Sequence, residues 1–161
     1  VLRDRDDIKI TLVGDGNRKD HVMNEVSRRG LANVHIRGFL GDSDMLALLR
    51  EADLGFVSLA PGIEGLGVPS KAYNLMAMGI PLLAVLVQTS EVARIIREHG
   101  VAFRHDVGDA VGLANTIIRA NKDEAGIARM SLAAYKFARA QCSLEYTAER
   151  LLEILCSLVD K

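Results

Sequence analysis

The segment Gly62–Pro81 carries the residues whose types and spacing are best suited to holding an anion. A glycine-rich loop that contains Glu64 leads into a short predicted helix, and Ser70 and Lys71 stand in the first turn of that helix. A helix N-terminus offers unpaired backbone N–H groups and a positive dipole end, which together bind phosphates. Lys71 opposes this dipole, so its position favours an anionic ligand. Glu64 is either an acceptor for sugar hydroxyls or a solvated loop acid.

A second pair of glycines, Gly14 and Gly16, follows the first predicted strand and opens a helix. This context suits a dinucleotide-binding turn, but Lys19 occupies the third glycine position and no acid follows the second strand to hold a ribose. The pattern therefore disfavours NAD. A tight turn between a strand and a helix, or one wall of a phosphosugar cleft, remains open.

Several other chemistries lack the residues that they need. A phosphoacceptor receiver domain needs acids at the ends of strands, whereas Asp6, Asp7 and Asp53 precede their strands. No G-x-S-x-G motif supports a hydrolase, and no cluster of Asp, Glu, His or Cys has the spacing of a metal site. The histidines stand singly and are predicted to be surface or cap residues: His21, His35, His99 and His105.

Composition sets the broad class of the protein. The chain has 161 residues, of which 49% are hydrophobic, and we expect one domain over residues 1–161. A net charge of −1 gives no basic surface for nucleic acid. Cys142 and Cys156 form neither a metal pair nor a disulfide framework. Without a signal peptide or an apolar run of about 20 residues, the sequence predicts a cytoplasmic protein.

Short apolar runs alternate with segments of helical period, which predicts an α/β fold: a Rossmann-like parallel sheet of about five strands with flanking helices and a helical C-terminal tail. Several of the runs are continuous, and we expect those strands to be buried on both faces. The predicted strands are Ile8–Val13, Val34–Arg37, Leu54–Leu59, Leu82–Val87 and Val101–Phe103. The predicted helices are Arg18–Arg29, Asp42–Ala52 (capped by Asp42 or Ser43), Ser70–Met78, Ser90–His99, Asp109–Ala120, Asp123–Gln141 and Leu144–Val159. An apolar stripe on the last helix either packs over the sheet or docks on a missing partner domain.

Five motifs and their order give the chain a resemblance to a known family. The motifs are Leu12-Val13-Gly14-Asp15-Gly16, Asn33–Leu40, Ala52-Asp53, the loop around Glu64, and Tyr73–Pro81, with Ser90-Glu91 and Gly100-Val101-Ala102 matching the later part of the pattern. Over residues 8–155 the chain resembles the C-terminal, nucleotide-sugar-binding half of retaining GT-B glycosyltransferases of the group 1 (family 4) type. The variant Pro-Ser-Lys-x-Tyr is similar to that of bacterial enzymes that build surface polysaccharides.

The resemblance assigns each part of a nucleotide-sugar donor to residues of this chain. It places the diphosphate at Ser70 and Lys71, and it makes Glu64 and Lys71 the catalytic groups. Further donor contacts are implied at Gly14, Gly16, Gly38, Phe39, Leu40, Gly65, Leu66 and Gly67, with the base against Gly38, Phe39 and Leu40. Asn74 stands where the family has a ribose-binding glutamate, and it follows Glu64 at a spacing two residues longer than usual.

The resemblance also implies partners and chemistry. Transfer would need no metal and no cofactor besides the donor, and the acceptor would be a glycan or lipid-linked molecule held by an N-terminal domain that this chain lacks. A family strand near the sheet centre is missing as well, so 161 residues alone are not expected to catalyse transfer. The resemblance allows peripheral membrane association of the full protein and a homodimer of this part. A non-catalytic nucleotide- or phosphosugar-binding module is the alternative; an epimerase would need acids and a histidine that this loop does not supply.

Overall fold

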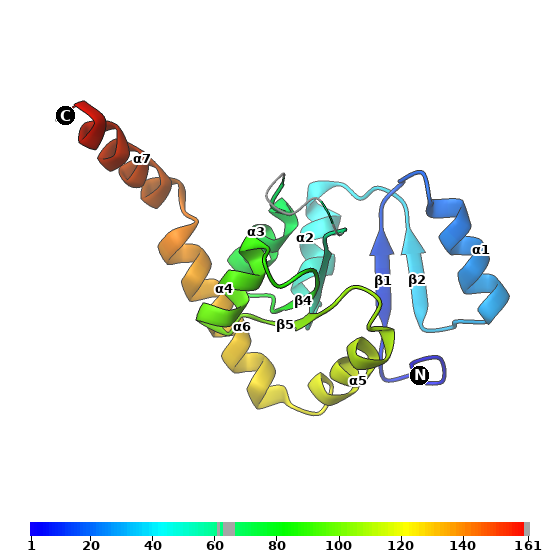
Figure 1. The fold of residues 1–161 in the computed structure, drawn as a ribbon. Coiled ribbons are helices and arrows are strands. Elements are labelled where there is room, and N and C mark those ends of the chain that lie inside the picture. The colour runs from blue at the N-terminus through cyan, green and yellow to red at the C-terminus, as the bar shows by residue number, and fades with distance from the viewer. Residues whose placement is uncertain (61, 63–66, 160–161) are drawn as a thin grey trace. The chain divides into compact units, whose positions relative to one another are not determined.

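The computed structural model describes residues 1–60, 62 and 67–159 (Figure 1). Within these residues the chain folds into five strands and seven helices that alternate up to the last two helices. Its contacts divide it into two compact units, and each is described here by itself. The first unit is Val1–Glu51 with Ala110–Lys122, and the second is Ala52–Asp109 with Asp123–Lys161. The expectation of a single domain stays a prediction, because contacts within a chain do not test whether a part folds independently.

The first unit holds a two-stranded parallel sheet with Ile10 opposite Val34. Its elements are β1 (Ile10–Val13), α1 (Lys19–Arg29), β2 (Val34–Arg37), α2 (Asp42–Arg50) and α5 (Ala110–Ala120). Asn33, just before β2, ties down the N-terminal segment because its side-chain amide donates to the carbonyls of Leu2 (2.9 Å) and Arg5 (3.2 Å). These bonds hold the N-terminal segment against the start of the sheet.

The second unit holds a three-stranded parallel sheet in the order β3-β4-β5. Its elements are β3 (Gly55–Ser58), α3 (Ser70–Ala77), β4 (Leu82–Val85), α4 (Glu91–His99), β5 (Ala102–His105), α6 (Glu124–Gln141) and α7 (Leu144–Val159). Its largest fully buried side chains come from α3, α4 and the strand segments: Met76, Leu82, Leu86, Val92, Ile95 and Val101. Helix α3 packs on both β3 and α6, so it lies in the core of this unit.

The predicted fold class is confirmed, since five parallel strands alternate with helices. In the described residues the strands form two ladders, one of two and one of three strands. The missing family strand stays a prediction. The expectation that strands are buried on both faces is right for β4. It is wrong for β1 and β3, where Leu12 and Phe56 are exposed. On β3, alternate side chains point to opposite faces. The face of Gly55 and Val57 is buried, whereas Phe56 and Ser58 point away.

Helix ends agree with the sequence in one case and differ in another. Ser90 caps α4 as predicted, because its hydroxyl oxygen accepts the N–H of Ala93 at 3.2 Å. The predicted cap of α2 by Asp42 or Ser43 is wrong: Gly41 is the N-cap, and Asp42 lies inside the first turn, where its charge favours the positive end of the helix dipole.

The second unit contains one histidine that packs against a phenylalanine, and both cysteines of the chain. The ring of His99, the last residue of α4, lies 4.6 Å from the ring of Phe137 on α6, so this histidine packs between helices. Cys142 and Cys156 are free thiols, as predicted.

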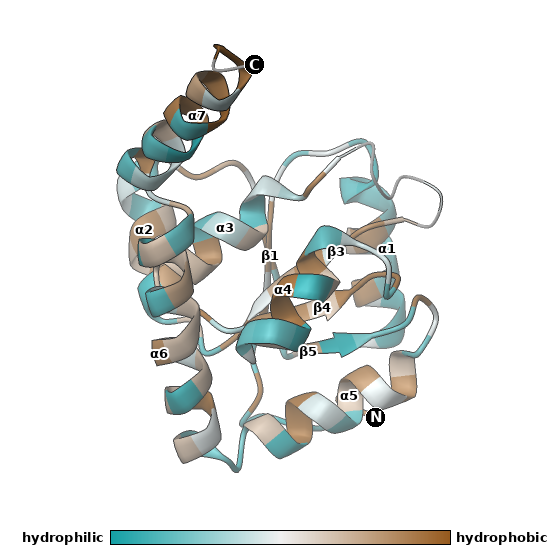
Figure 2. Cartoon of the chain, turned by 60° about the vertical axis from the view of Figure 1, so that its left-hand side comes forward, coloured by the Kyte–Doolittle hydropathy of each residue, from teal (hydrophilic) through white to brown (hydrophobic). Residues whose placement is uncertain are grey.

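The apolar stripe of α7, whose hydrophobic residues are brown in Figure 2, is exposed. No residue of α7 is buried, so the expectation that its stripe packs over the sheet is wrong, whereas α6 packs on α3 and α4. The exposed apolar side chains are Leu144, Leu151, Leu152, Ile154, Leu155, Leu158 and Val159. Across the described residues, the helices lack the length and apolar character of a membrane span.

The approach of α3 to β3 depends on the missing side chain of Gly55. A Cβ there would lie 2.6 Å from Cδ1 and 2.8 Å from Cδ2 of buried Leu75. We expect Gly55→Ala to lower the free energy of unfolding by about 1–3 kcal/mol, measured by urea denaturation. Gly16→Ala is the matched control, because its Cβ would meet no atom within 4 Å and its φ is not positive.

A double-mutant cycle checks the cause. In the Leu75→Ala background the added methyl group has room, so Gly55→Ala should cost less there than in the wild type. Equal costs in both backgrounds would show that Leu75 is not what Gly55 accommodates.

Candidate functional site

The N-terminus of α3 is open to an anion. Pro69 is the N-cap, no side chain of the described residues caps the helix, and its first turn contains no acid. By contrast, α1, α2 and α4 each carry an acid in the first turn. Unpaired N–H groups and an uncompensated dipole therefore meet at this end of α3.

Two predicted site residues stand at this helix end. Ser70 and Lys71 are both exposed, and Lys71 takes part in no ion pair with the described residues. Asn74, one turn further along, is exposed too. Buried residues of the same helix, Ala72 and Met76, anchor it in the core. The ammonium group of Lys71 is thus offered to solvent from a fixed helix.

A cavity of about 240 Å³ lies where β3 and β4 end and where α3 and α4 begin. In parallel α/β sheets, ligands bind outside the carboxyl ends of the strands, which is the place of this cavity. Its lining residues come from the segments that follow the two strands: Leu59, Gly67, Val68, Pro69, Thr89, Ser90, Glu91 and Val92. Of the predicted donor contacts, Gly67 lines it directly.

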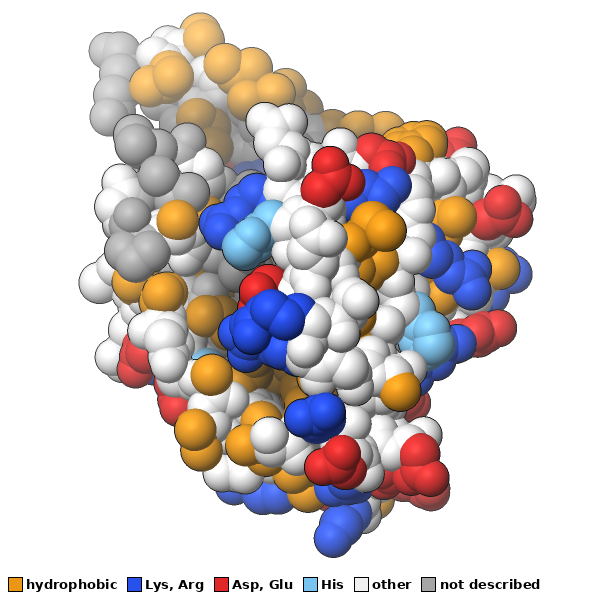
Figure 3. All heavy atoms as spheres, turned by 90° about the vertical axis from the view of Figure 1, so that its right-hand side faces the viewer, with side chains coloured by type: hydrophobic (Ala, Val, Ile, Leu, Met, Phe, Trp, Pro, Cys, Tyr) orange, Lys and Arg blue, Asp and Glu red, His pale blue; other side chains and the backbone are white. Residues whose placement is uncertain are grey.

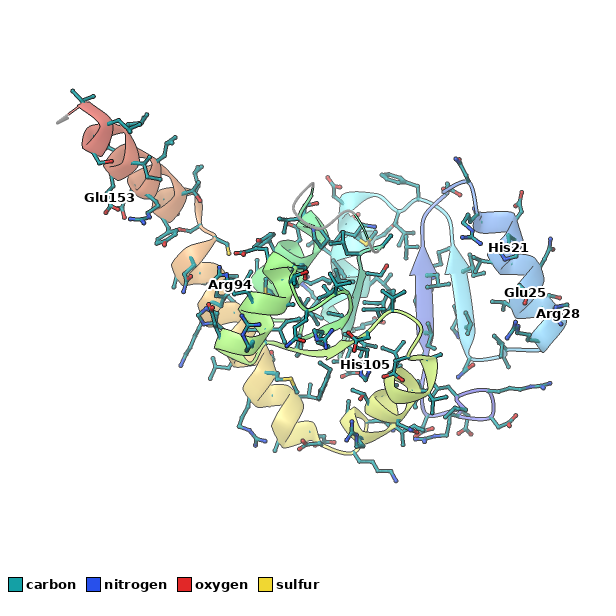
Figure 4. All side chains as sticks on the ribbon, viewed as in Figure 1. His21, Glu25, Arg28, Arg94, His105 and Glu153 are labelled. Atoms are coloured by element: carbon teal, nitrogen blue, oxygen red, sulfur yellow. The ribbon has the colours of Figure 1, made fainter. Side chains whose placement is uncertain are left out.

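Glu91 gives this cavity an ionised carboxylate. The guanidinium of Arg94 binds both of its oxygens, at 2.5 Å and 3.1 Å, and this bond lowers the pKa of Glu91. Arg94, labelled in Figure 4, also binds Glu98 at 2.5 Å. An ionised carboxylate accepts hydrogen bonds without donating, so Glu91 suits the hydroxyl groups of a ligand. Burial, assisted by the charge of Glu91, raises the pKa of the Tyr73 phenol, which stays neutral.

The predicted residues of the first unit gather around Asp15, which lies between Gly14 and Gly16. Its Oδ2 accepts the N–H of Phe39 at 2.6 Å, and its Oδ1 binds Lys19. Gly14 takes a positive φ of 146°, which favours glycine. Beside this turn lies a shallow depression of about 200 Å³, lined by Leu12, Val13, Gly14, Gly16, Arg18, Lys19, Val22 and Ile36.

The structure thus brings predicted residues together within each unit. Gly67, Ser70 and Lys71 lie at the start of α3 in the second unit. Gly14, Gly16, Gly38 and Phe39 lie around one carboxylate in the first unit, with Leu40 half-buried beside them. Glu64, Gly65 and Leu66 fall outside the described residues.

Sequence reasoning missed three residues as parts of a site: Thr89, Glu91 and Asp15. The signal for Thr89 and Glu91 was their place between a buried strand and the Ser90 cap, because segments at that edge of a parallel sheet meet. The signal for Asp15 was a carboxylate between two glycines. In the described part of the chain, no three His, Cys, Asp or Glu side chains group as a metal site would require. Both basic and acidic side chains are present on the face drawn in Figure 3.

Comparison with known proteins identifies the family. Residues 1–123 match the family described as Glycosyl transferases group 1. The chain belongs to this family. A relative, the probable glycosyltransferase WbjE of Pseudomonas aeruginosa, is 37% identical over 105 residues, which cover 65% of this chain and 26% of WbjE. The resemblance seen in the sequence is therefore confirmed at the level of the family.

Two solved structures share the fold of this group 1 glycosyltransferase chain. HepE (Alr3699) of Anabaena in complex with UDP is 25% identical, with a TM-score of 0.75 over 93% of this chain. The same protein in complex with UDP-glucose gives a TM-score of 0.72 over 92% of this chain at 25% identity. The chain spans 41% of HepE, so it corresponds to less than half of that protein.

If the bond to Arg94 lowers the pKa of Glu91, removing the guanidinium should raise that pKa. Because the bond lowers the pKa of Glu91 in the folded protein, it stabilises the fold above the ordinary pKa of a glutamate, and this stabilisation is lost as the pH falls through the lowered value. We expect Arg94→Met to move the Glu91 titration, followed by carboxyl-carbon NMR, to higher pH. Arg97→Met, on the same helix, is the control and should leave it in place. A titration that Arg94→Met does not move would show that Arg94 is not the cause.

Proposed function

We propose that this chain binds a nucleotide-diphosphate-sugar donor and is the donor-binding part of a glycosyltransferase. The observation that carries the proposal is the uncapped N-terminus of α3, with Lys71 beside it and an adjoining cavity. The complexes of HepE with UDP and with UDP-glucose support a uridine nucleotide as the first ligand to test.

The diphosphate would bind at the start of α3. Backbone N–H groups and the dipole favour the charge, and the Lys71 ammonium adds a full positive charge. When the sugar leaves, negative charge grows on the diphosphate, and donors already in place stabilise it without reorganising. Because the chain supplies these groups itself, we propose that donor binding needs no metal and no further cofactor.

The sugar would occupy the cavity between the starts of α3 and α4. Its hydroxyl groups can donate to the ionised carboxylate of Glu91, and the exposed Thr89 hydroxyl can both donate and accept. Glu64, the other proposed catalytic group, and its neighbours Gly65 and Leu66 stay predictions. So do the base contacts at Gly38, Phe39 and Leu40.

A second part of the proposal concerns the activity of the whole protein. We propose transfer with retention to a glycan or lipid-linked acceptor that the remainder of the protein holds, in the cytoplasm. The alternative is a binding module without transfer, and the observation that favours it is Asn74, an exposed amide where the family has a ribose-binding glutamate. An amide binds a hydroxyl without the strength of a charged acceptor.

Calorimetric titration of the chain with UDP, GDP and their sugars, each with and without EDTA, tests the proposal. We expect saturable binding of at least one nucleotide that EDTA does not change. No binding of any of them at millimolar concentration would contradict both the enzyme and the module. If a full-length protein binds a nucleotide sugar but transfers no sugar to any offered acceptor, the non-catalytic binding module is the proposal that stands.

The role of Lys71 is tested by Lys71→Ala. Loss of a charged hydrogen-bond donor should weaken the binding of UDP by about 1–3 kcal/mol. Lys136→Ala, on an exposed position of α6, is the matched control and should bind UDP as the wild type does. Unchanged affinity in Lys71→Ala would remove this residue from the site.

A further inference from the structure

Asp15 joins two loops that lie far apart in the sequence. Its Oδ2 accepts the backbone N–H of Phe39 at 2.6 Å, across 24 positions of the chain. One loop follows β1 and the other follows β2, so the carboxylate links the carboxyl ends of two paired strands. A bond from an N–H to an ionised carboxylate is stronger than a bond to a neutral acceptor.

Lys19 holds the same carboxylate from the other side. Its ammonium binds Oδ1 of Asp15, which leaves Oδ2 for Phe39. The two bonds hold the pKa of Asp15 below its usual range, with the bond to Lys19 as the larger cause. The carboxylate is therefore charged and held in one orientation.

Gly38 leaves the space that this arrangement needs. A Cβ on Gly38 would lie 3.3 Å from Oδ2 of Asp15, 3.5 Å from its Oδ1 and 3.6 Å from Nζ of Lys19. A larger side chain would press on the carboxylate and push it away from the Phe39 N–H. Glycine at this position thus permits the close approach of the two loops.

The bond sets the position of an exposed aromatic residue. Phe39 is 84% exposed, so packing contributes little to where its ring stands. Its backbone N–H, in contrast, is fixed by Asp15. The direction in which this ring projects therefore depends on the carboxylate.

We propose that Asp15 is a positioning residue for the nucleotide base: through the N–H of Phe39 it holds the segment Gly38–Leu40 in the place where the base binds. This inference rests on the proposed function, which assigns the base to that segment. In this proposal Asp15 touches no part of the donor and affects the affinity for the base through the backbone of Phe39.

The test compares UDP with inorganic pyrophosphate, which lacks the base, by calorimetry. We expect Asp15→Ala to weaken UDP binding about tenfold, because the segment that carries Phe39 would then have to be ordered when UDP binds, and to leave pyrophosphate binding within about twofold of the wild type. Asp15→Asn keeps a carbonyl oxygen that can accept from Phe39, so it should restore most of the UDP affinity. Asp20→Ala, on an exposed position of α1, removes the same charge and should change neither affinity.

Amide NMR gives a readout that needs no ligand. The Phe39 amide should exchange faster with solvent in Asp15→Ala than in Asp15→Asn, because only the asparagine retains the acceptor. Wild-type UDP affinity in Asp15→Ala, or an equal loss for UDP and pyrophosphate, would overturn the positioning role while leaving the proposed function intact. A wild type that binds pyrophosphate but not UDP would overturn the base assignment itself, and the positioning role with it. If Asp15→Ala does not fold, Asp15→Asn decides, because its neutral oxygen makes a weaker bond to the Phe39 N–H. The Phe39 amide should then exchange faster than in the wild type, and the UDP affinity should fall about two- to fivefold while pyrophosphate binding is kept. Wild-type UDP affinity, or a loss of UDP affinity without faster exchange, overturns the role.

Discussion

The packing of α3 between β3 and α6 is the constraint on which the candidate site depends. Ala72, Leu75 and Met76 bury one face of the helix, and Gly55 lets Leu75 come close to the strand. At the far end Gly79 takes a positive φ of 71°, which turns the chain toward β4. A helix held at its middle and its end presents its first turn at a fixed place, and an anion site built from backbone N–H groups requires that.

Charges of opposite sign are separated in the second unit in a way that matches a nucleotide sugar. Lys71 and the start of α3 favour the negatively charged diphosphate, whereas Glu91 is an acceptor for neutral hydroxyl groups. Arg94 keeps Glu91 ionised and offsets its charge, so that the carboxylate repels the diphosphate less. The start of α3 and Glu91 therefore offer an anion site and a hydroxyl site side by side, as the proposed donor requires.

Local patterns predicted much of this arrangement. Apolar runs bounded by Gly, Pro or Asp indicated the parallel strands, and Lys71 in a first helical turn indicated an anion site at the start of α3. What could not be predicted depends on contacts between distant segments. The bond from Phe39 to Asp15 forms only when β1 and β2 pair, and Glu91 reaches the cavity only because β4 ends beside β3. An apolar run or stripe also looks the same whether or not another element covers it, which is why β3 and α7 are more exposed than expected.

The proposed site at the start of α3 can be tested by the amide chemical shifts of the ¹⁵N-labelled chain, followed while UDP is added. If the diphosphate binds there, the amides of Ser70 and Lys71 should shift among the most strongly, since their N–H groups would donate to phosphate oxygens. Saturable binding of UDP that leaves these two amides unmoved would contradict the proposed site.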